Sequence, residues 1–218
     1  MTTLIVIAKE TIPGKVKTRL TPDFSPEQAA ELAAAAIADT FAAVADLPFT
    51  RRILAFDGTL LPDGFERFEV IPQVSGGLDA RLGAIFDECD GQTVLVGMDT
   101  PQLTPEHLAP VVGDWPEGID AWFGPAVDGG FWALGLASPD GDLIRGVEMS
   151  RSDTGVQQLV RLAKAGLGVG MLAPLTDVDT IVEATSVADA APDTRFATLF
   201  REFAARTSAD AARIGVAA

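Results

Sequence analysis

The sequence predicts an α/β fold built on a mainly parallel sheet. Short apolar, β-branched segments alternate with longer segments of helical composition, the order that places helices between parallel strands. The chain has 218 residues, 48% of them hydrophobic and 22% charged, so it can bury a sizeable core without disulfides or a metal. We expect a single domain over residues 1–207 and a frayed C-terminal tail over residues 208–218.

The N-terminal part of the chain supplies two strands and the first long helix. Leu4–Ala8 is a short β-branched segment followed by a turn-rich loop, which predicts a buried strand. Ser25 begins a helix, because Gln28 stands where a capping box requires it. The alanine-rich stretch that follows has high helix propensity and carries this helix to about Asp46. Arg52–Phe56 predicts the second strand.

The same alternation continues to the C-terminus. The remaining expected strands are Phe68–Pro72, Thr93–Gly97, Ile119–Gly124, Phe131–Leu136 and a segment near Val169–Leu172. The remaining expected helices are Leu78–Glu88, a short helix from Thr104, one near Asp153–Ala165 and a terminal helix from about Arg195. Ligands of such sheets bind beyond the carboxyl ends of the strands, so function is expected after Ala8, Asp57, Gly97 and Leu172.

Composition excludes several classes of protein. The net charge is −15, from 31 acidic and 16 basic residues, so neither nucleic acid nor an anionic membrane is an expected partner. A single cysteine, Cys89, and a single histidine, His107, exclude disulfide frameworks and Cys- or His-rich metal sites. We expect Cys89 in a packing role and His107 as a surface or packing residue. We expect neither a signal peptide nor a transmembrane helix, and therefore a cytoplasmic protein.

Positive charge gathers in the loop after the first strand. Three of the four lysines of the chain, Lys9, Lys15 and Lys17, lie within nine residues, and Arg19 follows them. Gly14 lets the same loop turn sharply. Because backbone N–H groups and cationic side chains together neutralise phosphates, the loop is a candidate polyphosphate site. The alternative is a solvated basic loop, and the spacing of a Walker A motif is absent.

Acidic residues follow two later strands. Asp99 comes directly after the strand that ends at Gly97, where a carboxylate can bind Mg²⁺ or Mn²⁺ together with phosphate oxygens and water. Asp177 and Asp179 follow the strand near Val169–Leu172. Alternate residues of an extended segment face opposite ways, so we expect only one of these two carboxylates to meet Asp99. Turn and helix-cap roles are the alternatives.

A glycine-rich turn joins the two strands that follow Ile119. Asp128, Gly129 and Gly130 form a strong turn signal ahead of Phe131 and Trp132. The glycines would let a substrate approach the backbone, and Asp128 could bind a hydroxyl group, hold a metal or act as a base. A purely structural turn is the more common role of such a pattern.

Taken in order, these segments resemble the bacterial radical-SAM/selenodomain-associated transferase family. The matching segments are Ala8–Glu10, Pro13–Leu20, Gly97–Leu103, Gly124–Pro125 with Asp128–Trp132, and Asp177–Thr180. The resemblance covers about residues 3–185. That family is similar to the nucleotide-diphospho-sugar transferases of GT-A fold, which implies a three-layer sandwich with a mainly parallel mixed sheet. It also resembles 2-phospho-L-lactate guanylyltransferase, which shares the Lys-Thr-Arg-Leu element.

The resemblance implies roles for individual residues. Those expected to bind the nucleotide are Ala8, Lys9, Gly14, Lys15, Lys17, Arg19, Gln73 and Arg81. Those expected to act in catalysis are Lys17, Arg19 and Asp128. Asp99 and Asp179 would hold Mg²⁺ or Mn²⁺. Those expected to line the acceptor side are Asp128, Gly129, Gly130 and Ser150.

The chain departs from the pattern of this family near its expected acceptor site. Gly77 stands where the family has Asp, Asp79 where it has Gly, Met149 where it has Trp, and Phe131 where Tyr is usual. These changes bear on the acceptor more than on the phosphate and metal roles.

Two reactions fit the expected partners, which are a nucleotide or nucleotide-sugar donor and a small-molecule acceptor. The dense basic loop favours nucleotidyl transfer from a nucleoside triphosphate, because more charge must be neutralised. The family resemblance favours glycosyl transfer from a nucleotide-sugar. A non-catalytic nucleotide or nucleotide-sugar binding module is a further alternative, to which Gly77, Asp79 and Met149 point. The sequence leaves the base, the acceptor and the oligomeric state open.

Overall fold

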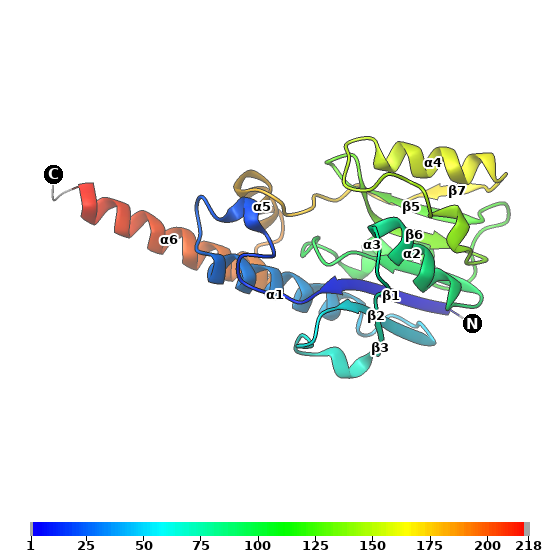
Figure 1. Cartoon of the computed structure of the whole chain (residues 1–218), viewed down its shortest axis with the longest axis horizontal. Coiled ribbons are helices and arrows are strands. Elements are labelled where there is room, and N and C mark those ends of the chain that lie inside the picture. Colours follow the sequence, from blue (N-terminus) through cyan, green and yellow to red (C-terminus); the bar gives the residue numbers. More distant parts are fainter. Residues whose placement is uncertain (1, 216–218) are drawn as a thin grey trace.

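The computed structural model describes residues 2–215 and confirms the fold class that the sequence predicts. The described residues form one seven-stranded sheet with helices on both faces (Figure 1). The strands are β1 (Thr2–Lys9), β2 (Arg51–Asp57), β3 (Glu69–Pro72), β4 (Gln92–Val96), β5 (Ala121–Pro125), β6 (Phe131–Leu136) and β7 (Val169–Met171). The helices are α1 (Pro26–Val44), α2 (Leu78–Asp87), α3 (Pro105–Leu108), α4 (Thr154–Lys164), α5 (Ile181–Ala190) and α6 (Arg195–Gly215). Short 3₁₀ helices lie at Thr18–Leu20, Phe65–Arg67, Ala109–Val111 and Gly141–Leu143.

The sheet is mixed and mainly parallel. Its strand order is β3-β2-β1-β4-β6-β5-β7. The pairs β1–β2, β1–β4, β2–β3 and β5–β7 are parallel, whereas β6 runs antiparallel to both β4 and β5. The carboxyl ends of the parallel strands therefore meet along one edge, where ligands of open α/β sheets bind.

Each face of the sheet has its own apolar core. Along β1, Leu4 and Val6 pack with side chains of α1 and α3, whereas Ile5 packs with side chains of α2 and α4. This alternation follows from the strand period of two. The uninterrupted apolar segment Leu4–Ala8 is thus explained by burial of the strand on both faces.

Helix α1 is buried on two sides, which explains its many alanines. Ala33 and Ile37 contact the core on the sheet, while Ala29 and Ala36 belong to an outer cluster with α5 and α6. Small side chains let neighbouring elements approach α1 closely from both directions. Figure 1 shows α6 lying beside α1 and running away from the sheet.

The predicted strands and helices form close to the expected positions, and one helix was not expected. The sequence analysis assigned no helix to Ile181–Ala190, which forms α5. The domain boundary at residue 207 and the frayed tail beyond it stay predictions. Helix α6 is helical to Gly215, and residues 216–218 lie outside the described residues.

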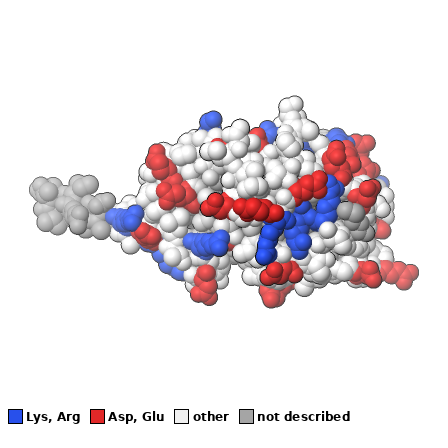
Figure 2. All heavy atoms as spheres, turned by 90° about the horizontal axis from the view of Figure 1, so that it is seen from below, with Lys and Arg blue, Asp and Glu red and all other residues white. Residues whose placement is uncertain are grey.

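Charged side chains are interleaved on the surface. On the face drawn in Figure 2, basic side chains lie beside acidic ones. Several arginines near β2 and β3 are paired with carboxylates, as in the Arg51–Glu69 contact of 2.8 Å and the Arg81–Asp57 contact of 2.6 Å. Within residues 2–215, no helix combines the length and the apolar character that crossing a bilayer requires.

Candidate active site

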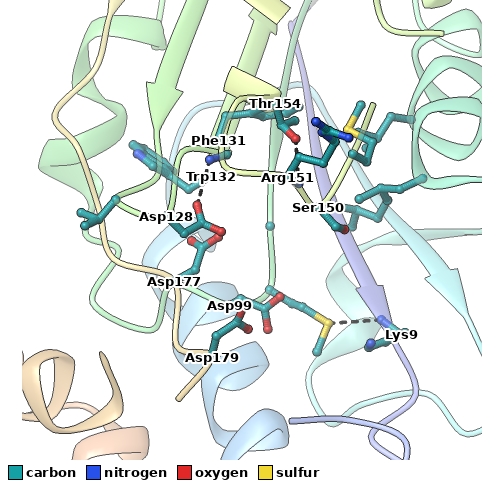
Figure 3. A pocket seen from close by; sticks show the side chains of 18 of the residues that line it. Lys9, Asp99, Asp128, Phe131, Trp132, Ser150, Arg151, Thr154, Asp177 and Asp179 are labelled. Atoms are coloured by element: carbon teal, nitrogen blue, oxygen red, sulfur yellow. Dashed lines mark hydrogen bonds between the residues drawn. The ribbon is translucent and has the colours of Figure 1, made fainter. Parts of the chain in front are cut away.

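A pocket of about 710 Å³ opens at the carboxyl ends of β1 and β4. Its walls come from the ends of these two strands, Arg19, the β3–α2 region, the β5–β6 hairpin, the loop before α4, and the chain that leads into α5 (Figure 3). The sequence predicts a ligand site in this place, because the segments after Ala8 and Gly97 both contribute to it.

Four carboxylates line one side of the pocket: Asp99, Asp128, Asp177 and Asp179 (Figure 3). Backbone contacts bring their segments together. The Val178 N–H donates to the carbonyl of Asp99 over 2.9 Å, and the Val127 N–H donates to that of Leu175 over 3.0 Å. The chain after β7 is thereby held against the end of β4 and the hairpin.

The ammonium group of Lys17 lies beneath these carboxylates. Its Nζ is 2.5 Å from Oδ1 of Asp99 and 3.5 Å from Oδ1 of Asp179, and it donates to the carbonyl of Val178. The Lys17 side chain is only 7% exposed. Burial lowers the pKa of Lys17, but the nearby carboxylates, Asp99 above all, outweigh burial and leave this pKa above its ordinary value.

The carboxylate of Asp177, unlike the ammonium group of Lys17, lacks a hydrogen-bond partner for one of its oxygens. Its Oδ1 is buried and accepts no hydrogen bond from any described residue. Burial, together with the charges of Asp99 and Asp128, raises the pKa of Asp177 to about 7, although Lys17 lowers it. A buried carboxylate oxygen without a donor is costly unless a cation reaches it.

A divalent cation fits this group of residues. Asp99, Asp177 and Asp179 offer the hard oxygen ligands that Mg²⁺ and Mn²⁺ prefer, and Oδ1 of Asp177 lacks a partner. Within residues 2–215, no group of three or more Asp, Glu, His or Cys side chains is arranged to hold a metal ion, so the carboxylates would supply one or two ligands at most. A metal ion held here would therefore take its remaining ligands from water and phosphate, as Mg²⁺ commonly does.

The opposite wall of the pocket carries Gln73 and Arg81. The Gln73 amide donates to the carbonyls of Ala8 and Ala55, each over 2.9 Å, and so ties together the ends of β1 and β2. Its Oε1 accepts from Arg81 over 3.3 Å. Arg81 also pairs with Asp57, which holds the guanidinium group in place at the pocket. Both residues thus have structural roles in addition to lining the pocket.

The glycine hairpin packs directly on the loop before α4. Gly129 has a φ of +92°, and a Cβ there would lie 2.0 Å from the carbonyl oxygen of Ser152. The Gly155 N–H donates to the carbonyl of Gly129 over 2.8 Å. Oδ1 of Asp128 accepts the Gly130 N–H over 2.8 Å, an Asx-type turn that fixes the hairpin. The glycines therefore serve backbone packing as well as turn geometry.

The structure brings most of the predicted site residues to the pocket. Those that line it are Ala8, Lys9, Arg19, Gln73, Arg81, Asp99, Asp128, Gly130, Ser150 and Asp179. Gly14, Lys15, Lys17 and Gly129 do not line it. Gly14 and Lys15 are exposed on the loop. Lys17 pairs with Asp99 and Asp179, and Gly129 packs against the backbone of Ser152. The functional roles of all these residues stay predictions.

Sequence reasoning missed part of the site. Only one of Asp177 and Asp179 was expected to meet Asp99, yet both line the pocket with Asp99, because the chain leaves β7 as irregular backbone. Arg151 and Glu183 also line it and were not proposed. His107 has a structural role, since its Nδ1 accepts the Thr104 N–H over 3.1 Å in a capping box.

Solved structures share this fold. A Desulfovibrio desulfuricans protein, provisionally described as a nucleotide-diphospho-sugar transferase, is 24% identical, with a TM-score of 0.83 over 95% of this chain and 96% of that one. A nucleotidyl transferase from Methanothermobacter is 15% identical, with a TM-score of 0.56 over 87% and 96%. Rv0371c from Mycobacterium tuberculosis is 20% identical, with a TM-score of 0.53 over 85% and 96%. The fold is therefore the GT-A-like fold of nucleotide-diphospho-sugar transferases.

A family assignment accompanies the fold. Residues 32–151, more than half of the chain, match the family DUF2064, described as an uncharacterized protein conserved in bacteria. The chain belongs to this family. No curated protein matches the sequence.

Proposed function

We propose that the protein is a metal-dependent transferase that takes a nucleotide donor and a small-molecule acceptor, with nucleotidyl transfer from a nucleoside triphosphate as its reaction. The observation that carries this proposal is the buried, unpartnered oxygen of Asp177 beside Asp99 in a pocket of about 710 Å³. A pocket of this size accommodates a nucleotide and a small acceptor.

The donor would lie between the two walls of the pocket. Its nucleoside would contact the apolar side chains of Leu78 and Leu82 and the polar pair Gln73 and Arg81. Its phosphates would lie toward Asp99, where a bound divalent ion would neutralise phosphate oxygens. Arg19, whose side chain is 72% exposed, is free to turn from Asp179 toward the phosphates. Lys9 and Lys15 would add charge from the same loop.

The acceptor would lie against Asp128, Gly130 and Ser150. In nucleotidyl transfer an acceptor oxygen forms a bond to the α-phosphorus, the bond to pyrophosphate breaks, and the acceptor releases a proton. Asp128, which lines the pocket, would receive that proton. Arg19 and the basic loop would stabilise the charge of the departing pyrophosphate.

Glycosyl transfer is the second candidate. It is supported by the description of the Desulfovibrio relative as a nucleotide-sugar transferase and by Asp128, which could activate an acceptor hydroxyl. The resemblance to radical-SAM-associated transferases and to 2-phospho-L-lactate guanylyltransferase belongs to this proposal too, and makes GTP the first triphosphate to test. A nucleotide donor and the single buried Cys89 suit a cytoplasmic protein.

A thermal-shift panel tests the proposal. It would compare nucleoside triphosphates with nucleotide-sugars, each with and without Mg²⁺ or Mn²⁺. A ligand at about 100 times its Kd stabilises a protein by roughly 2.7 kcal/mol, which is readily detected. We expect a metal-dependent shift with one triphosphate. A shift with nucleotide-sugars alone would favour glycosyl transfer, and no shift at all would contradict the proposal. A shift with a triphosphate from which no pyrophosphate is released in a separate assay would favour the non-catalytic module.

A further inference from the structure

We propose that Lys17 is an internal counter-cation that occupies the acidic side of the pocket until a metal–nucleotide complex arrives, so that the protein binds the divalent ion together with the nucleotide and not before it. This inference rests on the proposed function, since it concerns the same site. It differs from the role that the family resemblance implies, in which Lys17 contacts phosphate from the start.

The first argument is the position of the ammonium group. Nζ of Lys17 has three acceptors around it: Asp99 at 2.5 Å, Asp179 at 3.5 Å and the carbonyl of Val178. An ammonium group has three N–H donors, so these acceptors can satisfy it completely. With its side chain only 7% exposed and outside the pocket lining, Lys17 is not available to a phosphate in this arrangement.

The second argument is charge. Lys17 and a divalent ion would both need the carboxylate of Asp99, and two cations that share one carboxylate repel each other at short range. Metal alone would have to overcome this repulsion. A nucleotide brings several negative charges, so that Lys17 can exchange Asp99 for a phosphate oxygen while the metal ion takes its place. Both cations are then neutralised.

The third argument is the backbone. Lys17 has a φ of +47°, in the left-handed region that residues other than glycine rarely adopt. The loop therefore holds the side chain inward at a conformational cost. Val16, just before Lys17, is buried in the core and anchors the backbone, whereas Thr18, just after it, is exposed. Turning outward would therefore be a movement of the Lys17 side chain and not of the whole loop.

Titration with Mn²⁺ alone tests the inference without any nucleotide. Binding would be followed by the loss of the free Mn²⁺ electron-spin signal in the wild type, in Lys17→Met and in Lys164→Met. The last variant removes the same charge from an exposed position on α4. We expect Lys17→Met to bind Mn²⁺ at least about tenfold more tightly than the wild type, because a cation within 4 Å of the site is removed. Lys164→Met should behave as the wild type.

Each other outcome has a distinct meaning. Equal Mn²⁺ affinity in the wild type and Lys17→Met would overturn the inference and leave the metal site of the proposed function standing. No Mn²⁺ binding in either protein would also overturn the inference, because removing Lys17 would then open no site for the ion, and metal binding together with a nucleotide would be decided by the thermal-shift panel.

A second measurement needs no variant, should Lys17→Met fail to fold. The chain has only four lysines, so the ¹⁵N signal of the Lys17 ammonium group can be assigned by NMR. We expect this signal to stay in place on addition of Mg²⁺ alone and to move when the triphosphate that stabilises the protein most is added. Displacement by Mg²⁺ alone, or no movement at saturation with the triphosphate, would overturn the inference.

Discussion

The carboxylate of Asp177 lies where it would be more favourable with a bound cation than without one. Its buried Oδ1 has no donor among the described residues, and three further aspartates lie on the same side of the pocket. Lys17 satisfies Asp99 and Asp179 but does not satisfy Asp177. At the residue scale, the protein therefore keeps an unfavourable interaction at the point where we place the metal.

The raised pKa of Asp177 gives a pH-dependent prediction for the metal-free protein. Its ordinary pKa is 3.8 and its folded value is about 7, so between these values the folded state binds more protons than the unfolded state. Stability therefore falls as pH rises from about 4 to about 7, through repulsion from Asp99, Asp128 and Asp179 and through burial. We expect Asp177→Asn to raise the free energy of unfolding at pH 8, by at most about 4 kcal/mol.

Urea unfolding in the presence of a chelator measures this effect. The gain from Asp177→Asn should be smaller at pH 5 than at pH 8, because near pH 5 the folded carboxyl group is already protonated. Asp46→Asn is the control, since that side chain is 97% exposed. A loss of stability at pH 8, or an equal effect at both pH values, would show that the Asp177 carboxylate is not buried as described.

Gly129 gives a prediction about backbone packing. Both Gly129→Ala and Gly113→Ala force a Cβ onto a residue of positive φ, at +92° and +80°, which costs about 1 kcal/mol in each case. Only the Cβ at Gly129 meets backbone atoms, 2.0 Å from the Ser152 carbonyl oxygen, whereas the one at Gly113 has open space. We expect Gly129→Ala to lower the thermal midpoint clearly more than Gly113→Ala. Similar midpoints would mean that the hairpin does not rest on the loop before α4.

At the scale of elements, a buried carboxylate joins the C-terminal helix to the rest of the molecule. Asp39 on α1 accepts the N–H groups of Arg195 over 3.0 Å and Phe196 over 2.9 Å, at the start of α6. It therefore acts as an N-cap supplied by another helix. Phe196 and Phe200 then pack on the outer side of α1.

We expect Asp39→Ala to lower the free energy of unfolding by about 1–3 kcal/mol, because the buried Phe196 N–H and the partly buried Arg195 N–H lose their acceptor. Asp39→Asn should cost less, since one oxygen remains. Urea titration of both variants against the wild type measures the difference. If Asp39→Ala were as stable as the wild type, α6 would not depend on this cap.

Elements that begin with a recognisable capping pattern can be predicted from a short stretch of sequence. The predicted box at Ser25 forms, with the Ser25 N–H donating to Gln28 Oε1 over 2.8 Å and the Gln28 N–H donating to Ser25 Oγ over 3.2 Å. The same chemistry at Thr180 and Glu183 starts α5, which was missed. That helix was predictable from the sequence, because Thr180-x-x-Glu183 is itself a capping-box pattern.

At the scale of the whole molecule, the order of the strands and the assembly of the pocket depend on long-range contacts. Nothing local in β6 shows that it lies between β4 and β5 and runs against both. The acidic and basic segments could be placed at one edge of the sheet by the rule for parallel strands. That Lys17 turns inward to Asp99, 82 positions later in the sequence, could not be read from either segment.

The central claim is that Asp99 holds a metal ion for a nucleotide, and calorimetric titration of Asp99→Asn tests it most directly. Asparagine preserves the shape and one acceptor for Lys17, so the fold should survive. With Mg²⁺ and the triphosphate that stabilises the wild type most, we expect Asp99→Asn to bind about 100-fold more weakly, or roughly 2.7 kcal/mol, and Asp46→Asn to bind as the wild type does. Metal-dependent nucleotide binding of unchanged affinity in Asp99→Asn would contradict the account.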